Sequence, residues 1–172
     1  ATTGGPAGAS SPTRGLFMGG YTPSADNKID YITISSTGNA TDFGDLTTTI
    51  VYAAGGASST RALRMGGATV NVIDYVTIAS TGNAVDFGDM QNATSMNGVC
   101  DSTRMVIRLS GRTTTEFVTM STTGNSTDFG TITSTSGSAS GDSSTRGIFA
   151  GSAASNIMEF ITTATLGNAV DF

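Results

Sequence analysis

Aspartate and arginine recur at fixed places along the chain, and these two side chains are the first candidates for chemistry. The stretch TDFGD at 41–45 returns as VDFGD at 85–89 and as TDFGT at 127–131, and the sequence ends on VDF. Each copy supplies one aspartate: Asp42, Asp86, Asp128 and Asp171. An arginine that follows a threonine lies upstream of each: Arg14, Arg61, Arg104 and Arg146. We expect a structural role for these eight residues, which could form a repeated bridge because a guanidinium matches a carboxylate bidentately. Arg61 and Arg104 should be well over half buried and bonded to backbone carbonyls or to a repeated aspartate.

The same aspartates allow one alternative, a calcium-binding loop. Asp42 and Asp45, like Asp86 and Asp89, lie three residues apart, and hard cations take oxygen ligands from carboxylates and carbonyls. Two carboxylates at this spacing are also common in ordinary turns. A specific metal or sugar site more often depends on one unit that departs from the others, so we expect no metal and no other cofactor.

The amino-acid composition excludes most catalytic arrangements. The sequence has no histidine, so a Ser-His-Asp triad, a Cys-His pair and the usual zinc sites cannot be assembled from this chain. Cys100 is the single cysteine, so it forms no internal disulfide, and we expect a structural role for it. The glycine pairs do not belong to a phosphate-binding loop. A carboxylate pair of the glycosidase type is the catalytic alternative that stays open, and we expect a protein that is not an enzyme.

Residues that depart from the repeat are the better candidates for binding. The first unit has a longer predicted loop, YTPSADNK at 21–28, and loops on a rigid scaffold often carry binding residues. Tyr21 could stack on a sugar ring, while Asp26, Asn27 and Lys28 could bond to its hydroxyl groups. Simple variation in loop length is the alternative interpretation.

Charge and hydropathy exclude two classes of partner. Eight Lys and Arg stand against thirteen Asp and Glu, which gives a net charge of −5 and argues against a nucleic-acid groove. No apolar run reaches about 18 residues, so we expect no membrane span. The sequence starts at Ala1 without the pattern of a signal peptide. We therefore expect one repeat domain over 1–172, which can be a fragment of a longer chain.

The elements that must position these residues also repeat. Gly38, Gly82, Gly124 and Gly167 are spaced 44, 42 and 43 residues apart, which defines four units near 1–44, 45–88, 89–130 and 131–172. In each unit a run such as GLFMGG, which begins at the repeated arginine, predicts an inner strand, and IDYITIS predicts the next. The Gly-Asn pair in STGNA predicts a tight hairpin turn, after which a third strand returns through the phenylalanine. Residues 47–58 can supply a fourth strand.

Four short antiparallel strands in a period near 43 residues are typical of a propeller blade. We therefore predict an all-β fold, a β-propeller of four blades with four antiparallel strands each, around a central channel. Four units can close alone or belong to a larger ring.

The order of features within a unit resembles the kelch repeat. An apolar strand ends in Gly66-Gly67, a second strand carries Asp74-Tyr75, and an aromatic residue follows a turn. Two units keep the double glycine, and phenylalanine stands where kelch units usually have tryptophan. The wording NVIDYVTIASTGNAVDFGD, together with SSTRG, also resembles repeats in large virion structural or tail proteins of phages of aquatic bacteria.

The virion resemblance implies an extracellular structural or adhesion module in a phage fibre, tail or capsid-associated protein. Its partners would be copies of itself in a homo-oligomer, other virion proteins, and a host-surface glycan or receptor. The kelch resemblance implies an alternative, a scaffold for protein–protein interaction. A polysaccharide-degrading enzyme is the third alternative, and it requires two carboxyl groups about 5 to 10 Å apart that face a groove.

Overall fold

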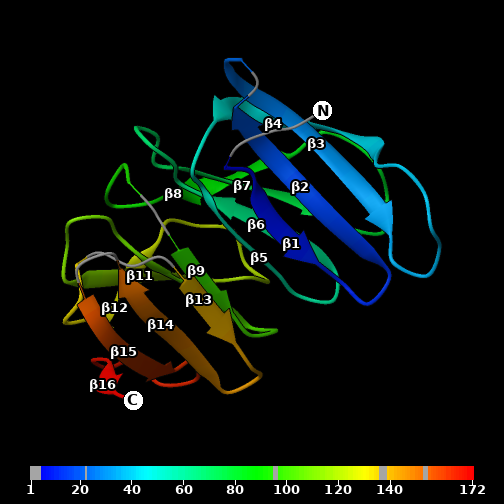
Figure 1. Cartoon of the computed structure of the whole chain (residues 1–172). Coiled ribbons are helices and arrows are strands. Elements are labelled where there is room, and N and C mark those ends of the chain that lie inside the picture. The colour runs from blue at the N-terminus through cyan, green and yellow to red at the C-terminus, as the bar shows by residue number, and fades with distance from the viewer. Residues whose placement is uncertain (1–4, 22, 95–96, 136–138, 153–154) are drawn as a thin grey trace.

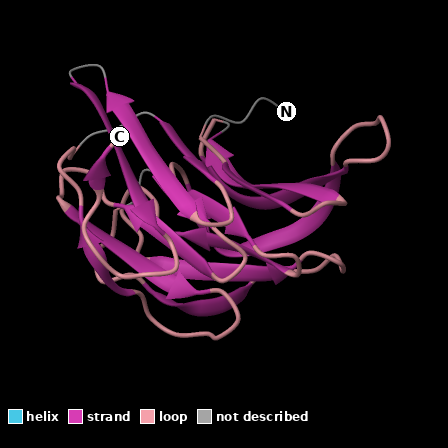
Figure 2. Ribbon diagram, turned by 90° about the horizontal axis from the view of Figure 1, so that it is seen from below, coloured by secondary structure: helices cyan, strands magenta, loops and turns pink. Residues whose placement is uncertain are grey.

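The chain folds into strands, turns and loops. The computed structural model describes residues 5–21, 23–94, 97–135, 139–152 and 155–172, and this part contains no helix (Figure 2). Its strands form four antiparallel sheets of four strands, each sheet built from consecutive strands. The predicted all-β fold with four propeller-like blades is therefore confirmed. In the described residues no helix has the length and apolar character that a membrane crossing requires.

Each blade is one sheet, and its strands are numbered in chain order. Blade 1 contains β1 (Ala7–Ser10), β2 (Arg14–Tyr21), β3 (Ala25–Thr33) and β4 (Thr41–Ile50). Blade 2 contains β5 (Ala54–Ala57), β6 (Arg61–Met65), β7 (Val72–Thr77) and β8 (Val85–Asp89). Blade 3 contains β9 (Asn97–Cys100), β10 (Arg104–Arg108), β11 (Thr114–Thr119) and β12 (Thr127–Thr131). Blade 4 contains β13 (Ala139–Asp142), β14 (Arg146–Ser152), β15 (Ser155–Thr162) and β16 (Val170–Asp171).

The first strand of every blade lies nearest the common axis. β1 packs beside β5, β5 beside β9, and β9 beside β13, so these four inner strands gather at the centre of Figure 1. The strand that begins at the repeated arginine is therefore the second of its sheet, where the sequence predicted the inner one. The strand that carries the repeated phenylalanine is the outer strand of its blade.

The transition from one blade to the next occurs later than the predicted unit boundary. The boundary expected after residue 44 falls inside β4, which continues to Ile50. Leu46 and Ile50 explain the extension, because both side chains are buried in the core between blades 1 and 2. Residues 47–58, expected as one strand, are accordingly divided between the end of β4, a connection, and the inner strand β5.

The core lies between neighbouring blades, because successive residues of a strand point to opposite faces. We call the face of a blade toward the next unit its forward face, and the opposite one its backward face. Leu16 and Phe43 of blade 1 share one apolar cluster with Ala62, Val76 and Ile78 of blade 2. Equivalent clusters join blade 2 to blade 3 and blade 3 to blade 4.

The four blades form an open arc. Within the described residues, no packing like that of neighbouring inner strands joins blade 1 to blade 4. Phe172, on the forward face of blade 4, is exposed, whereas the equivalent Phe43 is buried. Phe17, on the backward face of blade 1, is exposed, whereas the equivalent Phe149 is buried. The four units of this structure therefore do not close on themselves.

Candidate functional site: inter-blade joints and the axial funnel

The repeated arginines connect each blade to the next one. Three of them are partly buried and donate to a backbone carbonyl at the end of the third strand of the following blade. These bonds run from Arg14 Nη1 to the Ile78 oxygen (2.6 Å), Arg61 Nη1 to the Met120 oxygen (3.1 Å) and Arg104 Nη1 to the Thr163 oxygen (3.0 Å). Each guanidinium also lies over an aromatic ring of its own blade, a cation–π contact that fixes its direction. The fourth, Arg146, is exposed.

The repeated aspartates do not pair with these arginines. All eight residues are described, and none of the four arginines forms an ion pair with Asp42, Asp86, Asp128 or Asp171, which are exposed. The bridge is therefore absent, and Arg61 and Arg104 use the other expected partner, a backbone carbonyl. Phe43 shows the reason: it is buried and its ring stacks edge-on to Tyr31, so the neighbouring Asp42 points to the opposite side, toward solvent. In the described part of the chain, no three metal-ligating side chains lie close enough to hold an ion.

The Gly-Asn stretch lies on the outer strand of the preceding blade. At the first joint, the amides of Gly82 and Ala84 donate to the oxygens of Phe43 and Asp45, both at 2.8 Å. The Asp45 amide donates in return to Asn83 Oδ1 at 3.0 Å. The same three bonds recur at the second and third joints. The predicted hairpin turn is therefore wrong: residues 34–40 and their equivalents are longer loops, and their Gly-Asn pair docks on a neighbouring sheet.

The glycine of the TDFG stretch is needed for this docking. A Cβ at Gly44 would collide with the Gly82 carbonyl, and its φ of +148° is one that other residues rarely adopt. The backbone carbonyls around the TDFG stretch of one unit thus accept hydrogen bonds from the Gly-Asn loop of the next unit. The repeated motif consists of the two halves of one joint, so its copies in the interior of the chain are structural.

A third set of joint contacts uses the acidic residue of the third strand. Asp74, Glu116 and Glu159 are buried and accept hydrogen bonds from the preceding blade, either from within its outer strand, as with Thr47 of β4, or from residues just after that strand. Their donors are the Thr47 hydroxyl (2.6 Å) and amide (3.3 Å), the Gln91 amide (3.0 Å), and the Thr133 (2.8 Å) and Ser134 (3.1 Å) amides. The equivalent Asp30 of blade 1 is exposed. In the sequence this acid is the first residue of a repeated acid–aromatic pair, for which no role was predicted.

Asp74 also pairs with Arg64, an ion pair that sequence reasoning missed. Both side chains are fully buried between blades 1 and 2. Arg64 Nη1 donates further to the oxygens of Gly66 (3.0 Å) and Val72 (2.8 Å). Burial lowers the pKa of Arg64, while the Asp74 carboxylate opposes that shift. A signal was present in the sequence, because the position of Arg64 is apolar in all three other units: Phe17, Ile107 and Phe149.

The turns between first and second strands converge on the axis and form a funnel. In each turn a side-chain oxygen accepts a hydrogen bond from the backbone amide of the repeated arginine, which lies three residues later. These acceptors are Ser11, Ser58, Asp101 and Ser143. The funnel has a volume of about 400 Å³ and receives residues from all four blades: 10–12, 57–59, 100–102 and 142–144. Serine is therefore the commonest residue of its wall.

The ionisable groups of the funnel are held in different states. Burial raises the pKa of the Cys100 thiol to about 12, and the Asp142 carboxylate adds to this shift. Burial and the nearby Asp101 raise the pKa of Asp142. Burial also opposes ionisation of Asp101, but the amides of Arg104 and Thr103 bond to its carboxylate and lower its pKa overall. The thiol is thus protonated at neutral pH, and the wall can offer hydroxyl donors and acceptors to a polar ligand.

The binding loop predicted at 21–28 is mostly strand. Residues 25–28 belong to β3, and Thr22 lies outside the described residues. Asp26 Oδ1 accepts from the amides of Asn27 (2.8 Å) and Lys28 (3.3 Å), and Asn27 Nδ2 donates to the Leu46 oxygen at 3.4 Å. Of the four predicted residues, Tyr21 and Lys28 are exposed, whereas Asp26 and Asn27 bond to the backbone.

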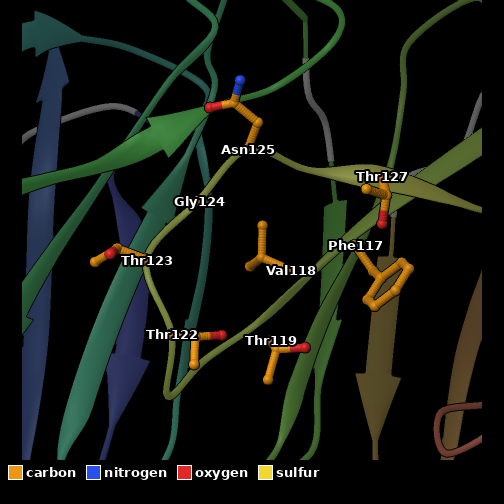
Figure 3. A pocket seen from close by; sticks show the side chains of 8 residues that line it. All are labelled: Phe117, Val118, Thr119, Thr122, Thr123, Gly124, Asn125 and Thr127. Atoms are coloured by element: carbon orange, nitrogen blue, oxygen red, sulfur yellow. The ribbon is translucent and has the colours of Figure 1, made fainter.

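A second kind of hollow repeats within the blades. In blade 3 it has a volume of about 220 Å³ and lies between β11 and the following loop, as Figure 3 shows with Phe117, Val118, Thr119 and Thr122. Blade 2 has the same hollow, of about 150 Å³, between β7 and the loop that contains Asn83. Its recurrence and its lining without charged side chains indicate a feature of blade geometry.

Comparisons with known proteins bear on the fold alone. No family model matches the sequence, and no curated protein matches it. Among solved structures, a novel fungal alcohol oxidase with catalytic diversity among the AA5 family, in complex with copper, resembles the chain with a TM-score of 0.69 at 10% identity. Hydrazine synthase of Kuenenia stuttgartiensis resembles it with a TM-score of 0.58 at 11% identity. The matches cover 97% and 91% of this chain but only 41% and 50% of those chains.

Proposed function

We propose that the chain is a non-catalytic structural and adhesion module of an extracellular assembly, most specifically a phage virion. In this proposal the blades are a rigid scaffold. The axial funnel presents polar groups to a host-surface glycan, and the exposed Tyr21, at the other end of β2, presents an aromatic ring. The observation that carries the proposal is the use of the repeated polar side chains: the arginines, asparagines and third-strand acids of the interior joints all bind backbone groups of a neighbouring blade.

The non-catalytic part rests on the state of the potential reactive groups. Glu116 and Glu159 are buried away from solvent, and their carboxylates accept amide hydrogen bonds of the preceding blade. Cys100 is protonated at neutral pH, and the thiolate is the reactive form of cysteine. The sequence also lacks a histidine that could act as a general base.

The glycan part rests on the funnel wall. Ser59, Ser102 and Ser144 are exposed there, one from each of three blades. Hydroxyl groups both donate and accept hydrogen bonds, so they match the hydroxyl groups of a neutral sugar. Contacts of this kind are individually weak, and several copies of the module in one assembly would raise the effective concentration. The virion and its other proteins are proposed because the repeat sequence resembles repeats in phage virion proteins.

The test measures retention on host-surface polysaccharide and release of reducing ends in the same incubation. We expect retention without release, and we expect Ser59→Trp, which fills the funnel, to reduce retention. Ser121→Trp, in an exposed loop of blade 3, is the matched control and should retain the polysaccharide. Release of reducing ends would make the protein a polysaccharide-degrading enzyme. Neither retention nor release would leave a structural spacer as the function.

A further inference from the structure

We propose that copies of this chain associate head to tail, with the forward face of blade 4 packed on the backward face of blade 1 of a second copy. The contact would repeat the joint that already links blades 1, 2, 3 and 4. The proposal rests on a comparison of equivalent positions, which are buried inside the arc and exposed at its two ends.

The forward face of blade 4 is an uncovered half of a joint. Met158 of β15 is 42% exposed, while the equivalent Ile29 and Ile73 are 0% exposed. Phe172 is 63% exposed, while the equivalent Phe43 is 2% exposed. The difference arises because blades 1 and 2 each have a following blade, whereas none covers blade 4 in this structure.

The backward face of blade 1 is the other half. Phe17 is 44% exposed, while the equivalent Ile107 of blade 3 is 0% exposed. Ile34 is 52% exposed, while the equivalent Ile78 and Met120 are 2% and 1% exposed. This end therefore exposes the apolar residues that the interior blades bury against a preceding blade.

The polar groups of the two ends are complementary as well. Arg146 lies over the ring of Phe160, in the pose from which the other three arginines reach the next blade. The carbonyl that such an arginine binds belongs, in blade 1, to Ile34. The loop 38–40 of blade 1 carries the Gly-Asn pair and is exposed. Asp30 is exposed too, whereas the equivalent acids accept hydrogen bonds from backbone amides. The blade 4 end supplies Arg146 and the oxygen of Phe172, which is equivalent to the Phe43 oxygen of the first joint, whereas the 172 residues include no equivalent of Asp45 or Thr47.

A second copy is the occupant that matches the exposed apolar residues and Arg146 together. These groups have the positions that they have at the three interior joints, so the contact continues an existing interface, with a shorter outer strand on the blade 4 side. A partner of other sequence would have to match the exposed apolar residues, Arg146 and the Gly-Asn loop together. Contact between two different faces is heterologous, and it closes into a ring or extends into a filament according to the rotation per unit.

Sedimentation velocity over a range of protein concentrations tests the proposal on the 172-residue chain. We expect reversible association of the wild type by about 100 µM. Ile34→Asp and Met158→Asp should each weaken it at least about tenfold, because each places a carboxylate in the apolar contact. Val85→Asp is the matched control: Val85 is exposed, as are the equivalent Thr41 and Thr127, so association should be unchanged. Circular dichroism and thermal melts verify that the variants fold.

A mixture of the two variants identifies the geometry. Ile34→Asp keeps an intact blade 4 face and Met158→Asp keeps an intact blade 1 face, so the mixture should form a complex with one intact joint, whereas each variant alone is monomeric. A wild type that is monomeric throughout would overturn the proposal. Association that Met158→Asp leaves unchanged would overturn it too, because the contact would then join two blade 1 faces.

Discussion

Asp30 and Asp74 occupy the same position in successive units, and their surroundings are opposite. Asp30 is exposed, whereas Asp74 is buried with Arg64 and binds Thr47 of the preceding blade. The difference arises from the blade that precedes the residue, since the two local sequences are nearly the same, KIDY and VIDY. Equivalent residues at the end and in the interior of the arc therefore serve as controls for each other.

We predict that Asp74→Ala lowers the free energy of unfolding by about 3 to 5 kcal/mol, because it leaves the buried Arg64 without its charge partner. Asp30→Ala should change it by less than about 0.5 kcal/mol, as is usual for surface substitutions. Urea denaturation followed by circular dichroism measures both variants. Equal effects would contradict the assignment of Asp74 to the joint.

Cys100 provides a prediction on pH and reactivity. Its pKa rises from 9.0 to about 12 through burial, so at pH 8 the thiolate fraction is about a thousandfold smaller than in the unfolded chain. We expect alkylation by iodoacetamide to be slower in the folded protein by a similar factor. Since the folded pKa is raised, its contribution to stability is complete below pH 9 and is lost between pH 9 and 12.

Mass spectrometry of the folded and the urea-unfolded protein gives the two alkylation rates. Cys100→Ala should lack the part of the alkaline loss of stability that is due to the thiol. Similar alkylation rates in the two states would show that the thiol is accessible and ionises normally.

The loop between the third and fourth strands is the element that joins the sheets. It binds the outer strand of the blade before it, where strand backbone would otherwise be unpaired. We predict that Asn83→Ala destabilises the protein by about 0.5 to 1.5 kcal/mol, because the Asp45 amide loses its acceptor.

Asn39 is the matched control for this element. It has the same place in the loop of blade 1, is exposed, and has no preceding blade to bind in this structure. Asn39→Ala should leave the urea midpoint unchanged. A loss as large as that of Asn83→Ala would indicate that the asparagine stabilises the loop itself.

The sequence predicts the repeat, the four strands per unit and the four blades, because strand patterns are local and the period is visible in the spacing of repeated residues. The joints were not predicted, since Asn83 and Asp45 lie far apart in the chain and no local pattern relates them. The Gly-Asn pair was assigned to a hairpin turn on local preference, and the fold used it for contact between sheets. The only sign of the Arg64 ion pair in the sequence is that an arginine stands at a position that is apolar in the other three units.

At the scale of the whole molecule, the extensive packing between blades in the described residues joins each blade to its neighbours along the chain. Stability in such an arrangement is close to a sum of unit terms and nearest-neighbour interface terms. Blades 2 and 3 have two interfaces each, while blades 1 and 4 have one. The ends of the arc are thus its least stabilised parts.

We predict that amide hydrogen exchange reflects this difference. Peptides from β6 and β7, and from β10 and β11, should exchange more slowly than peptides from β14 and β15, because opening an end blade breaks one joint and opening an inner blade breaks two. Exchange followed by mass spectrometry measures this at low protein concentration, where copies do not associate. Uniform protection in all four blades would show that the arc unfolds as one cooperative unit.

The two-part joint also bears on how such a chain changes over generations. Gly44 accepts the following loop and Gly82 belongs to the loop that docks there, so each unit carries both parts of the contact. A duplication or deletion of about one period, wherever the crossover falls, yields a chain in which every new neighbour pair is already compatible. Gene-level gain or loss of units therefore requires no compensating substitutions, and blade number can vary among descendants while the joint stays the same.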